Sequence, residues 1–209
     1  PGRISRMARI AQSSHSQLVA DSHQRQPATR VPYSQVVMHD YDTAGLRAHR
    51  RERDNHFSSH YASPIPEEHQ EAFAGLDYFL PDPALAVEGA FTGDERSLEV
   101  TSSTGGTSAY RVAGRIDLTV RGEARSVIAL WGEEDEIFVP FRDGTSGIES
   151  YGGGRYVPAV VSKNKATVDF NRALNPWCAY DEEFSCPLPP VDNWFDVAIT
   201  AGEKDYRPR

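Results

Sequence analysis

The side chains most capable of chemistry gather between residues 138 and 156, in the sequence FVPFRDGTSGIESYGGGRY. An apolar, strand-like run leads into Arg142, Asp143 and Thr145, and three consecutive glycines precede Arg155. Glycine has no Cβ atom, so it allows a sharp turn or the close approach of another group. A guanidinium can hold a carboxylate or a phosphate by two parallel hydrogen bonds. The pattern therefore predicts a site for a small polar molecule that bears one of these anions.

A second polar group follows the predicted strand at residues 167–170. Asp169 and Asn171 should point to the same side, because side chains alternate along a strand, and Asn175 stands just before a proline. Asn and Asp in such places either bind a polar ligand or cap the following turn, and the sequence favours neither. For an acid–base enzyme we predict as catalytic residues Asp143, Asp169 and Tyr151, and as ligand-binding residues Arg142, Thr145, Arg155, Asn171 and Asn175.

The same residues support a different hypothesis, that of a non-catalytic interaction or structural module. In such a module the polar side chains would brace the Gly-rich loop and the Pro-rich loop at 187–190, and Arg155 would pair with Asp143 or Asp169. A cavity lined by at least three of the predicted residues would favour the ligand site. Side chains that are all engaged with one another and with the backbone would favour the brace. The sequence leaves open whether the protein is an enzyme.

No residue pattern indicates a metal or a cofactor, and we expect neither. Cys178 and Cys186 are the only cysteines, and two thiolates alone do not complete a tetrahedral zinc site. Free cysteine behaves as a small buried hydrophobic residue, so we expect reduced thiols that pack the Pro-rich loop, with a disulfide as the alternative. All seven histidines precede residue 70, away from both polar groups. The glycine turn lacks the Lys-Ser or Lys-Thr pair of a phosphate-binding loop.

Length and composition indicate a globular protein with one large domain. The chain has 209 residues, of which 39% are hydrophobic, enough for one core. No apolar run approaches the ~20 residues that span a bilayer, so we expect no membrane segment. Residues 1–30 contain no apolar stretch of the kind that a secretory signal needs. We therefore expect a cytoplasmic protein.

Charge is distributed unevenly along the chain. Residues 1–60 contain nine Arg and five acidic residues, a net charge of +4, which leaves −12 for the remainder of a chain whose total is −8. An acidic main body argues against a nucleic-acid partner. Residues 1–40 have little hydrophobic periodicity and predict an arm, whereas 41–209 predict one β-rich domain. By charge complementarity we expect the arm to lie on its own acidic body or on a sister subunit, as in a homodimer.

Hydrophobic spacing predicts helices only in the N-terminal third and strands thereafter. A helix is expected at residues 43–57, with Asp42 or Thr43 as its cap, and a second at 64–74, with Ser63 as its cap. Period-two alternation predicts roughly eight or nine short strands. They lie at 84–91, 96–101, 116–120, 126–131, 137–141, 156–161, 167–170 and 195–200. The fold class is thus α+β, mainly β: a single antiparallel barrel or sandwich with N-terminal helices.

Several motifs of this chain, taken in order, resemble a bacterial family of unknown function, domain of unknown function 1684. They are residues 138–156, 168–176 with 178–180, 186–190 and 201–204, preceded by 73–79, 81–83 and a helix motif at 51–53. The similarity covers residues 46–204 and implies a single β-rich domain, but it brings no activity with it. The residues that match the family motifs are Asp143, Thr145, Tyr151, Arg155, Asp169, Asn171 and Asn175.

This chain departs from the family pattern in three places. Leu174 stands where the family commonly has Tyr, and residues 193–195 read Asn-Trp-Phe where it usually has Asn-Arg-Leu. Nineteen residues separate Arg53 from Phe73, where longer relatives carry an extra region. The missing arginine argues against an anion site shared by the whole family. Trp194 indicates instead a more apolar wall or a contact surface.

Overall fold

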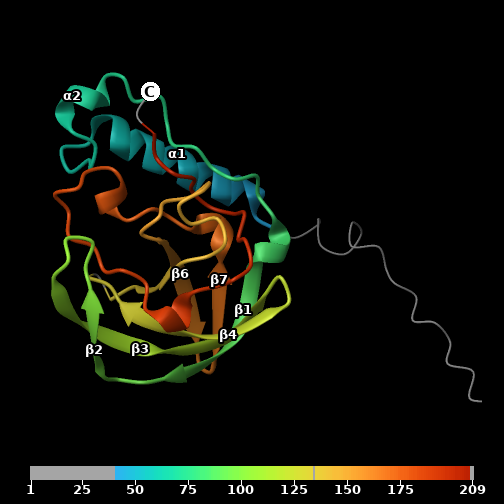
Figure 1. Cartoon of the computed structure of the whole chain (residues 1–209). Helices are drawn as coiled ribbons and strands as arrows, with labels where there is room; N and C mark the ends of the chain where they lie inside the picture. Colours follow the sequence, from blue (N-terminus) through green and yellow to red (C-terminus); the bar gives the residue numbers. More distant parts are fainter. Residues whose placement is uncertain (1–40, 134, 208–209) are drawn as a thin grey trace, which may run out of the picture. The chain divides into compact units, whose positions relative to one another are not determined.

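The computed structural model of this chain describes residues 41–133 and 135–207 (Figure 1). The predicted arm at 1–40, and the dimer contact expected of it, lie outside the described residues. Within the described part, no helix combines the length and the apolar character that crossing a lipid bilayer requires. All that follows concerns these two ranges.

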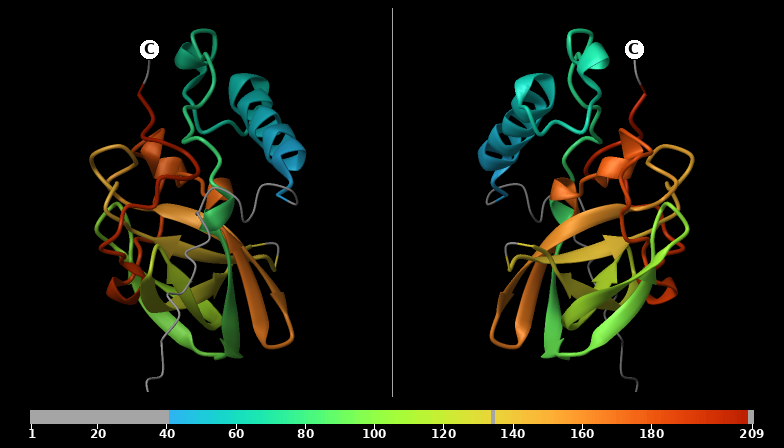
Figure 2. Two further views of the ribbon diagram at one scale, coloured as in Figure 1. Left: turned by 90° about the vertical axis from the view of Figure 1, so that its right-hand side faces the viewer. Right: turned by 90° about the vertical axis from the view of Figure 1, so that its left-hand side faces the viewer.

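In the described residues, seven strands form one antiparallel sheet that closes on itself (Figures 1 and 2). They are β1 (Ala86–Gly93), β2 (Ser97–Thr101), β3 (Thr107–Val120), β4 (Glu123–Trp131), β5 (Ile137–Phe141), β6 (Arg155–Ser162) and β7 (Lys165–Asp169). Their order is β1-β7-β6-β5-β4-β3-β2, and β1 also pairs with β3. Six strands therefore form a closed barrel, and β2 extends the first half of β3. The mainly β, α+β prediction is confirmed, as a barrel rather than a sandwich.

Strict alternation along β3 explains how the barrel acquires its inner face. Ile116, Leu118 and Val120 are buried, whereas Asp117 and Thr119 between them are exposed. Successive side chains of a strand point to opposite faces, so this spacing places one apolar row in the core. The sequence predicted this half of β3 for that reason.

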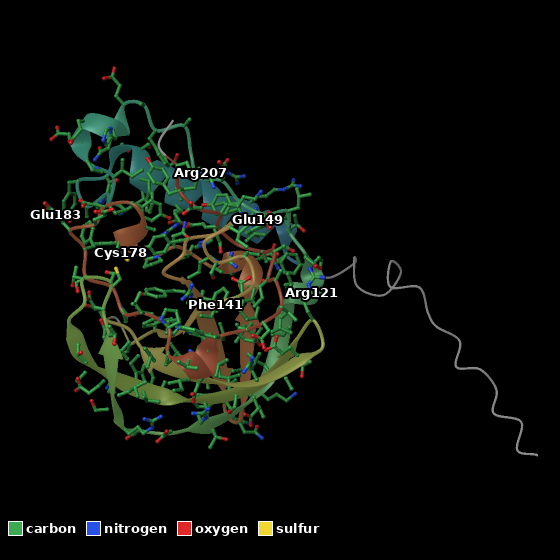
Figure 3. All side chains as sticks on the ribbon, in the orientation of Figure 1. Arg121, Phe141, Glu149, Cys178, Glu183 and Arg207 are labelled. Atoms are coloured by element: carbon green, nitrogen blue, oxygen red, sulfur yellow. The ribbon has the colours of Figure 1, made fainter. Side chains whose placement is uncertain are left out.

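Three aromatic rings fill the middle of the barrel. Phe141, Phe170 and Phe195 meet edge to face, with ring centroids 5.0, 6.0 and 6.4 Å apart, and Phe141 lies at the centre of the molecule in Figure 3. Edge-to-face packing is the favoured arrangement of such rings. The core thus joins β5 to the segments that follow β7.

Two glycines allow β1 and β3 to approach closely where the barrel closes. A Cβ atom at Gly114 would lie 2.3 Å from the carbonyl oxygen of Thr92, and one at Gly89 would lie 2.6 Å from that of Asp117. Side-chain carbons do not approach a backbone this closely, so glycine is required at both positions. The register of β3 against β4 also shifts beside Gly114, as it does at a β-bulge.

Helix α1 (Thr43–Ser59) lies across one end of the barrel (Figures 1 and 2). The carboxylate of Asp42 caps it by accepting a hydrogen bond of 2.8 Å from the amide of Gly45. Leu46 and Phe57 are its buried residues. The first predicted helix and its cap are therefore confirmed. Single-turn 3₁₀ helices of the described residues are η2 (Pro83–Leu85), η3 (Phe170–Arg172), η4 (Trp177–Ala179) and η5 (Val191–Asn193).

The second predicted helix is much shorter than expected. Only α2 (Glu67–Gln70) is helical, whereas the sequence predicted residues 64–74. Pro66 disfavours a helical conformation of the residue before it, and that residue, Ile65, is instead buried beside Phe57 and Tyr180. The hydroxyl of Ser63 accepts from the amide of Ile65 at 3.1 Å, which stabilises a turn rather than a helix end.

Residues 195–200 do not form the predicted last strand. Phe195 and Ile199 do face the core, as the alternation requires, and are 4% and 0% exposed. Their backbone, however, is bonded to side chains: the amide of Ile199 donates to Asp143 at 2.6 Å, and that of Val197 donates to Glu123 at 3.1 Å. Two main-chain bonds tie the segment to residues 142–144: the amide of Phe195 donates to the carbonyl of Arg142 at 2.8 Å, and the carbonyl of Val197 accepts from the amide of Gly144 at 3.0 Å. Because carboxylates bind the amides of Val197 and Ile199, these bonds do not continue into a ladder.

Candidate functional site

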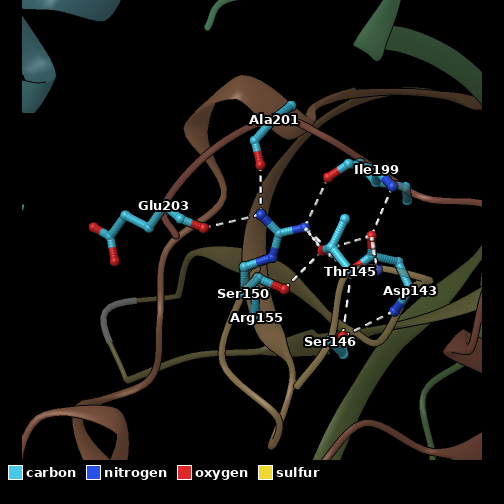
Figure 4. A network of polar contacts seen from close by, with 8 residues as sticks. All are labelled: Asp143, Thr145, Ser146, Ser150, Arg155, Ile199, Ala201 and Glu203. Atoms are coloured by element: carbon cyan, nitrogen blue, oxygen red, sulfur yellow. Dashed lines mark hydrogen bonds and ion pairs between the residues drawn. The ribbon is translucent and has the colours of Figure 1, made fainter. Parts of the chain in front are cut away.

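Arg155 is the centre of a buried polar network at one end of the barrel (Figure 4). It begins β6 directly after Gly154, whose φ of +95° favours glycine, and it is 0% exposed. One terminal nitrogen donates to the carbonyl oxygens of Ala201 and, at 3.0 Å, of Glu203. The other donates to the carbonyl oxygen of Ile199 at 2.9 Å. The glycine turn therefore directs this guanidinium inward, toward the C-terminal segment.

Asp143 is the acidic partner of Arg155, at 3.2 Å from its second terminal nitrogen. Both side chains are 0% exposed. The carboxylate also accepts from the amide and the hydroxyl of Thr145, at 3.2 and 2.9 Å, and from the amide of Ile199. The hydroxyls of Thr145 and Ser150 lie 2.7 Å apart. Each charged group is thus paired and hydrogen-bonded by protein atoms, and of the guanidinium only Nε is buried without a partner.

The electrostatics of this pair follow from its burial. Burial lowers the pKa of Arg155, and the Asp143 carboxylate opposes that change. An arginine remains charged even so, because its ordinary pKa is so high. A buried charge is tolerated only when it is paired and hydrogen-bonded, and here both conditions are met within the fold.

A second buried centre forms around Glu203, which is 0% exposed. Arg53 of α1 donates to one carboxylate oxygen, and the hydroxyl of Tyr180 and, at 2.8 Å, the amide of Asn175 donate to the other. Although burial by itself lowers the pKa of Arg53, the Glu203 carboxylate raises it above its ordinary value. Because the carbonyl of Glu203 accepts from Arg155, the two centres share one residue.

The sequence did not single out three members of this second centre, Arg53, Tyr180 and Glu203. Each lies in a short motif that carried the family resemblance, at 51–53, 178–180 and 201–204. The sequence does contain the arginine and the acid, Arg53 and Glu203, in two of these motifs. No spacing rule, however, predicts contact between residues that are 150 positions apart. Of the predicted site residues, only Asn175 belongs to this centre.

Asp169 and Asn171 lie together but outside the Arg155 network. Asp169 caps η3 by accepting from the amide of Asn171 at 3.1 Å, and it accepts from the hydroxyl of Tyr41 at 2.8 Å. The amide group of Asn171 bonds both the carbonyl and the amide of Asp82, each at 2.8 Å. These two residues therefore tie the start of η2 to the end of β7.

Tyr151 and Arg142 lie apart from each other and from Arg155. The hydroxyl of Tyr151 is 3.4 Å from the carbonyl oxygen of Cys178 and 3.6 Å from its sulfur. The guanidinium of Arg142 stacks over the ring of Trp194, 4.9 Å from its centroid. The eight predicted residues are thus distributed over several contacts rather than gathered around one opening.

Cavities occur elsewhere in the described part of the chain. Five of them are lined by none of the eight predicted residues. One of them is an open groove of about 410 Å³ between α1 and η4, which we call the α1 groove. Its lining residues are His49, Glu52, Arg53, His56, Phe57 and Trp177. Five of the six share one face of α1, as their spacing of three and four residues requires.

The α1 groove combines an aromatic wall with an acid. Trp177 is 43% exposed and packs edge-on against Phe184, at a centroid distance of 5.1 Å. Glu52 is exposed, whereas Arg53 is turned inward to Glu203. Nε2 of His49 is buried without a hydrogen-bond partner, and burial, assisted by Arg172 and Arg53, lowers the pKa of this imidazole. A neutral imidazole, with its unpaired Nε2 buried, therefore forms part of the groove wall.

Metal binding has no evident site in this region of the chain. Among the described residues, no group of three or more His, Cys, Asp or Glu side chains could hold a metal ion. The histidines of α1 are accordingly candidates for hydrogen bonding rather than for coordination.

Comparison with known proteins places the chain in a family. A family model described as "Protein of unknown function (DUF1684)" matches residues 71–204. The solution NMR structure of an uncharacterized protein of Haloarcula marismortui is 42% identical, covers 77% of this chain and 92% of that one, and superimposes with a TM-score of 0.62. No curated protein matches. The resemblance inferred from the motifs is confirmed, and the chain belongs to the DUF1684 family of proteins of unknown function.

Proposed function

We propose that this protein is a non-catalytic binding protein for a small organic cation, which it receives in the α1 groove. In this proposal the motif residues predicted from the sequence are a brace that holds the loops on the barrel. The observation that carries it is the contrast between the two regions. Arg155 is 0% exposed and bonded to protein acceptors, whereas Trp177 and Glu52 are open to a ligand.

The brace argues against the anion site predicted around Arg155. An incoming carboxylate or phosphate would have to displace Asp143 and the carbonyls of the C-terminal segment, and each of these is itself buried. Leaving a buried polar atom unsatisfied costs roughly 1–3 kcal/mol. Several such losses would offset what an anion gains from one guanidinium.

The chemistry of the α1 groove favours a cation over an anion. An ammonium or guanidinium group is attracted to the face of a tryptophan ring, and more strongly where a carboxylate stands nearby. Trp177 and Glu52 supply these two groups. Arg53, which also lines the groove, is neutralised by Glu203. The net charge of −12 on residues 61–209 adds a long-range attraction for a cation.

His49 does not repel a cation, because burial keeps its imidazole neutral. Its unpaired Nε2 is itself buried, although the residue lines the groove. The expected ligand is therefore an amine or guanidine on a short apolar stem.

Calorimetric titration with agmatine and with benzylamine tests this proposal, and succinate and inorganic phosphate are the contrasting anions. We expect the cations to bind, and Glu52→Gln and Trp177→Ala each to weaken binding at least tenfold. Matched controls are Glu182→Gln, an exposed acid of the neighbouring loop, and Trp194→Ala, whose ring is 41% exposed elsewhere.

Two results would overturn the proposal. One is that neither cation binds the folded protein. The other is that the anions bind instead and lose affinity in Arg155→Lys, which would establish the site predicted from the sequence.

A further inference from the structure

The two cysteines lie side by side, Cys178 in η4 and Cys186 in the loop that follows η4. The backbone amide of Cys178 donates to the sulfur of Cys186 at 3.4 Å. Cys186 is held in place from the other side by Ser103, whose hydroxyl accepts from its amide at 3.1 Å and whose amide donates to its carbonyl at 2.9 Å. Figure 3 shows Cys178 at η4, near the β2–β3 hairpin that carries Ser103. Both thiols are free in this structure.

Hydroxyl groups surround the sulfur of Cys178. The Tyr151 hydroxyl lies 3.6 Å from it, and burial, together with the hydrogen bond to Cys178, raises the pKa of this phenol. Tyr151 is therefore a protonated donor at neutral pH. The hydroxyl of Ser103, which donates to the carbonyl of Phe184 at 3.1 Å, also favours a lower pKa of the Cys178 thiol. The cysteines in turn raise the pKa of the Tyr110 and Tyr156 phenols, and Glu182 raises that of Tyr151.

The pair is electrostatically asymmetric. A hydrogen bond from the Cys186 thiol, opposed by burial and assisted by Ser103 and Tyr151, lowers the pKa of Cys178 to about 6. The same hydrogen bond and burial raise the pKa of Cys186. These shifts favour a thiolate at Cys178 and a protonated thiol at Cys186. The thiolate is the reactive form of cysteine, and a protonated thiol beside it can act as a resolving group.

We propose that Cys178 and Cys186 form a peroxide-reactive dithiol centre. The Cys178 sulfur attacks the terminal oxygen of a small hydroperoxide; an S–O bond forms, the O–O bond breaks, and the alkoxide takes up a proton. Cys186 then loses its proton and its sulfur attacks the sulfenic sulfur, so that an S–S bond forms and the S–O bond breaks, releasing water. Two thiols and one hydroperoxide give one disulfide, one alcohol and one water, with two electrons passing from sulfur to oxygen.

Access to the sulfur limits the oxidant to a small one. Cys178 is 5% exposed, and Cys186 is only partly buried. Hydrogen peroxide or a short alkyl hydroperoxide can reach such a sulfur, whereas a protein disulfide cannot. The proposal does not rest on the proposed cation site, since its test involves no ligand of the α1 groove.

The experiment treats the reduced full-length protein with hydrogen peroxide, alkylates the remaining thiols and measures the intact mass. We expect an internal disulfide in the wild type. In Cys186→Ser we expect a sulfenic acid on Cys178 that dimedone traps, and in Cys178→Ser an oxidation of Cys186 at least tenfold slower. Tyr151→Phe keeps both thiols and should move the pH profile of Cys178 alkylation toward the ordinary thiol range. Tyr156→Phe is its control, because that hydroxyl donates to the same loop, at the carbonyl of Pro187, 2.6 Å away.

The proposal is overturned by either of two results. In one, peroxide leaves both thiols of the folded wild type open to alkylation. In the other, the rate of oxidation and the pH profile of Cys178 are the same in Tyr151→Phe as in Tyr156→Phe. Comparing melting temperatures of the variants ensures that each is folded when it is tested.

Discussion

Replacing Arg155 by lysine is the most direct test of the brace. Arg155→Lys keeps the positive charge but removes the planar fork of the guanidinium. The two terminal nitrogens of Arg155 reach three main-chain carbonyls, the Asp143 carboxylate and the Thr145 hydroxyl. Lysine has a single nitrogen with three donors. It cannot span acceptors that lie on both sides of a fork, so at least two of them lose their donor.

The expected magnitude follows from these lost donors. A buried acceptor left unsatisfied costs roughly 1–3 kcal/mol, so Arg155→Lys should lower the free energy of unfolding by about 2–5 kcal/mol. In a domain of this size 1 kcal/mol corresponds to roughly 2–4 °C of melting temperature. We therefore expect the melting temperature to fall by about 10 °C.

Urea unfolding followed by circular dichroism measures this difference. The control is Arg121→Lys, because Arg121 pairs with Asp82 at the surface, where their side chains are 36% and 29% exposed. Surface pairs contribute little, and the control should stay within about 0.5 kcal/mol of the wild type. If Arg155→Lys unfolds at the same urea concentration as the wild type, Arg155 is not a brace and the reasoning is wrong.

Three further predictions concern other parts of the structure. Glu203→Gln should lower the free energy of unfolding by about 3–5 kcal/mol, because it leaves the Arg53 charge buried without a partner; an unchanged urea midpoint contradicts this. The pKa of His49 is lowered in the fold, so this residue contributes stability that is present above its ordinary pKa of 6.5 and is lost as the pH falls below that value. The melting temperature of His49→Gln should therefore fall less between pH 7 and pH 5 than that of the wild type. Gly114→Ala should lower the melting temperature, because its Cβ meets a carbonyl oxygen at 2.3 Å, whereas Gly93→Ala, with no atom nearer than 4.0 Å, should not.

The strands could be predicted where one face of the strand is buried and the other is not. The half of β3 at 116–120 alternates strictly, but its first half does not, since residues 107–109 are all exposed. Alternation is a signal of one-sided burial, so an exposed extension that pairs with β2 leaves no such signal. Residues 195–200 show the reverse case. Their alternation is real, but their backbone bonds partly to carboxylates of other segments and partly to the main chain of residues 142–144. The sequence of a segment cannot reveal such partners.

The brace could be predicted only as a pair. Arg155 and Asp143 are twelve residues apart, and the sequence suggested that they interact because the glycine turn brings distant chain segments together. It could not reveal that main-chain carbonyls of residues 199–203 complete the shell, because every residue has such a carbonyl. Nor does composition distinguish a buried arginine from an exposed one. Arg155 and Arg53 can be buried because the tertiary fold places an acid beside each of them. These acids are Asp143 and Glu203.

The brace and the α1 groove are not independent, and this decides how binding data should be interpreted. Glu203 fixes Asn175 and Tyr180, which flank η4 on either side, and η4 carries the Trp177 wall of the groove. The same carboxylate fixes Arg53 on α1, the opposite wall. Loss of this residue should therefore loosen both walls, although Glu203 itself does not line the groove. A lower affinity in a brace variant thus indicates a displaced wall, whereas a lower affinity at unchanged melting temperature in Glu52→Gln indicates a contact with the ligand.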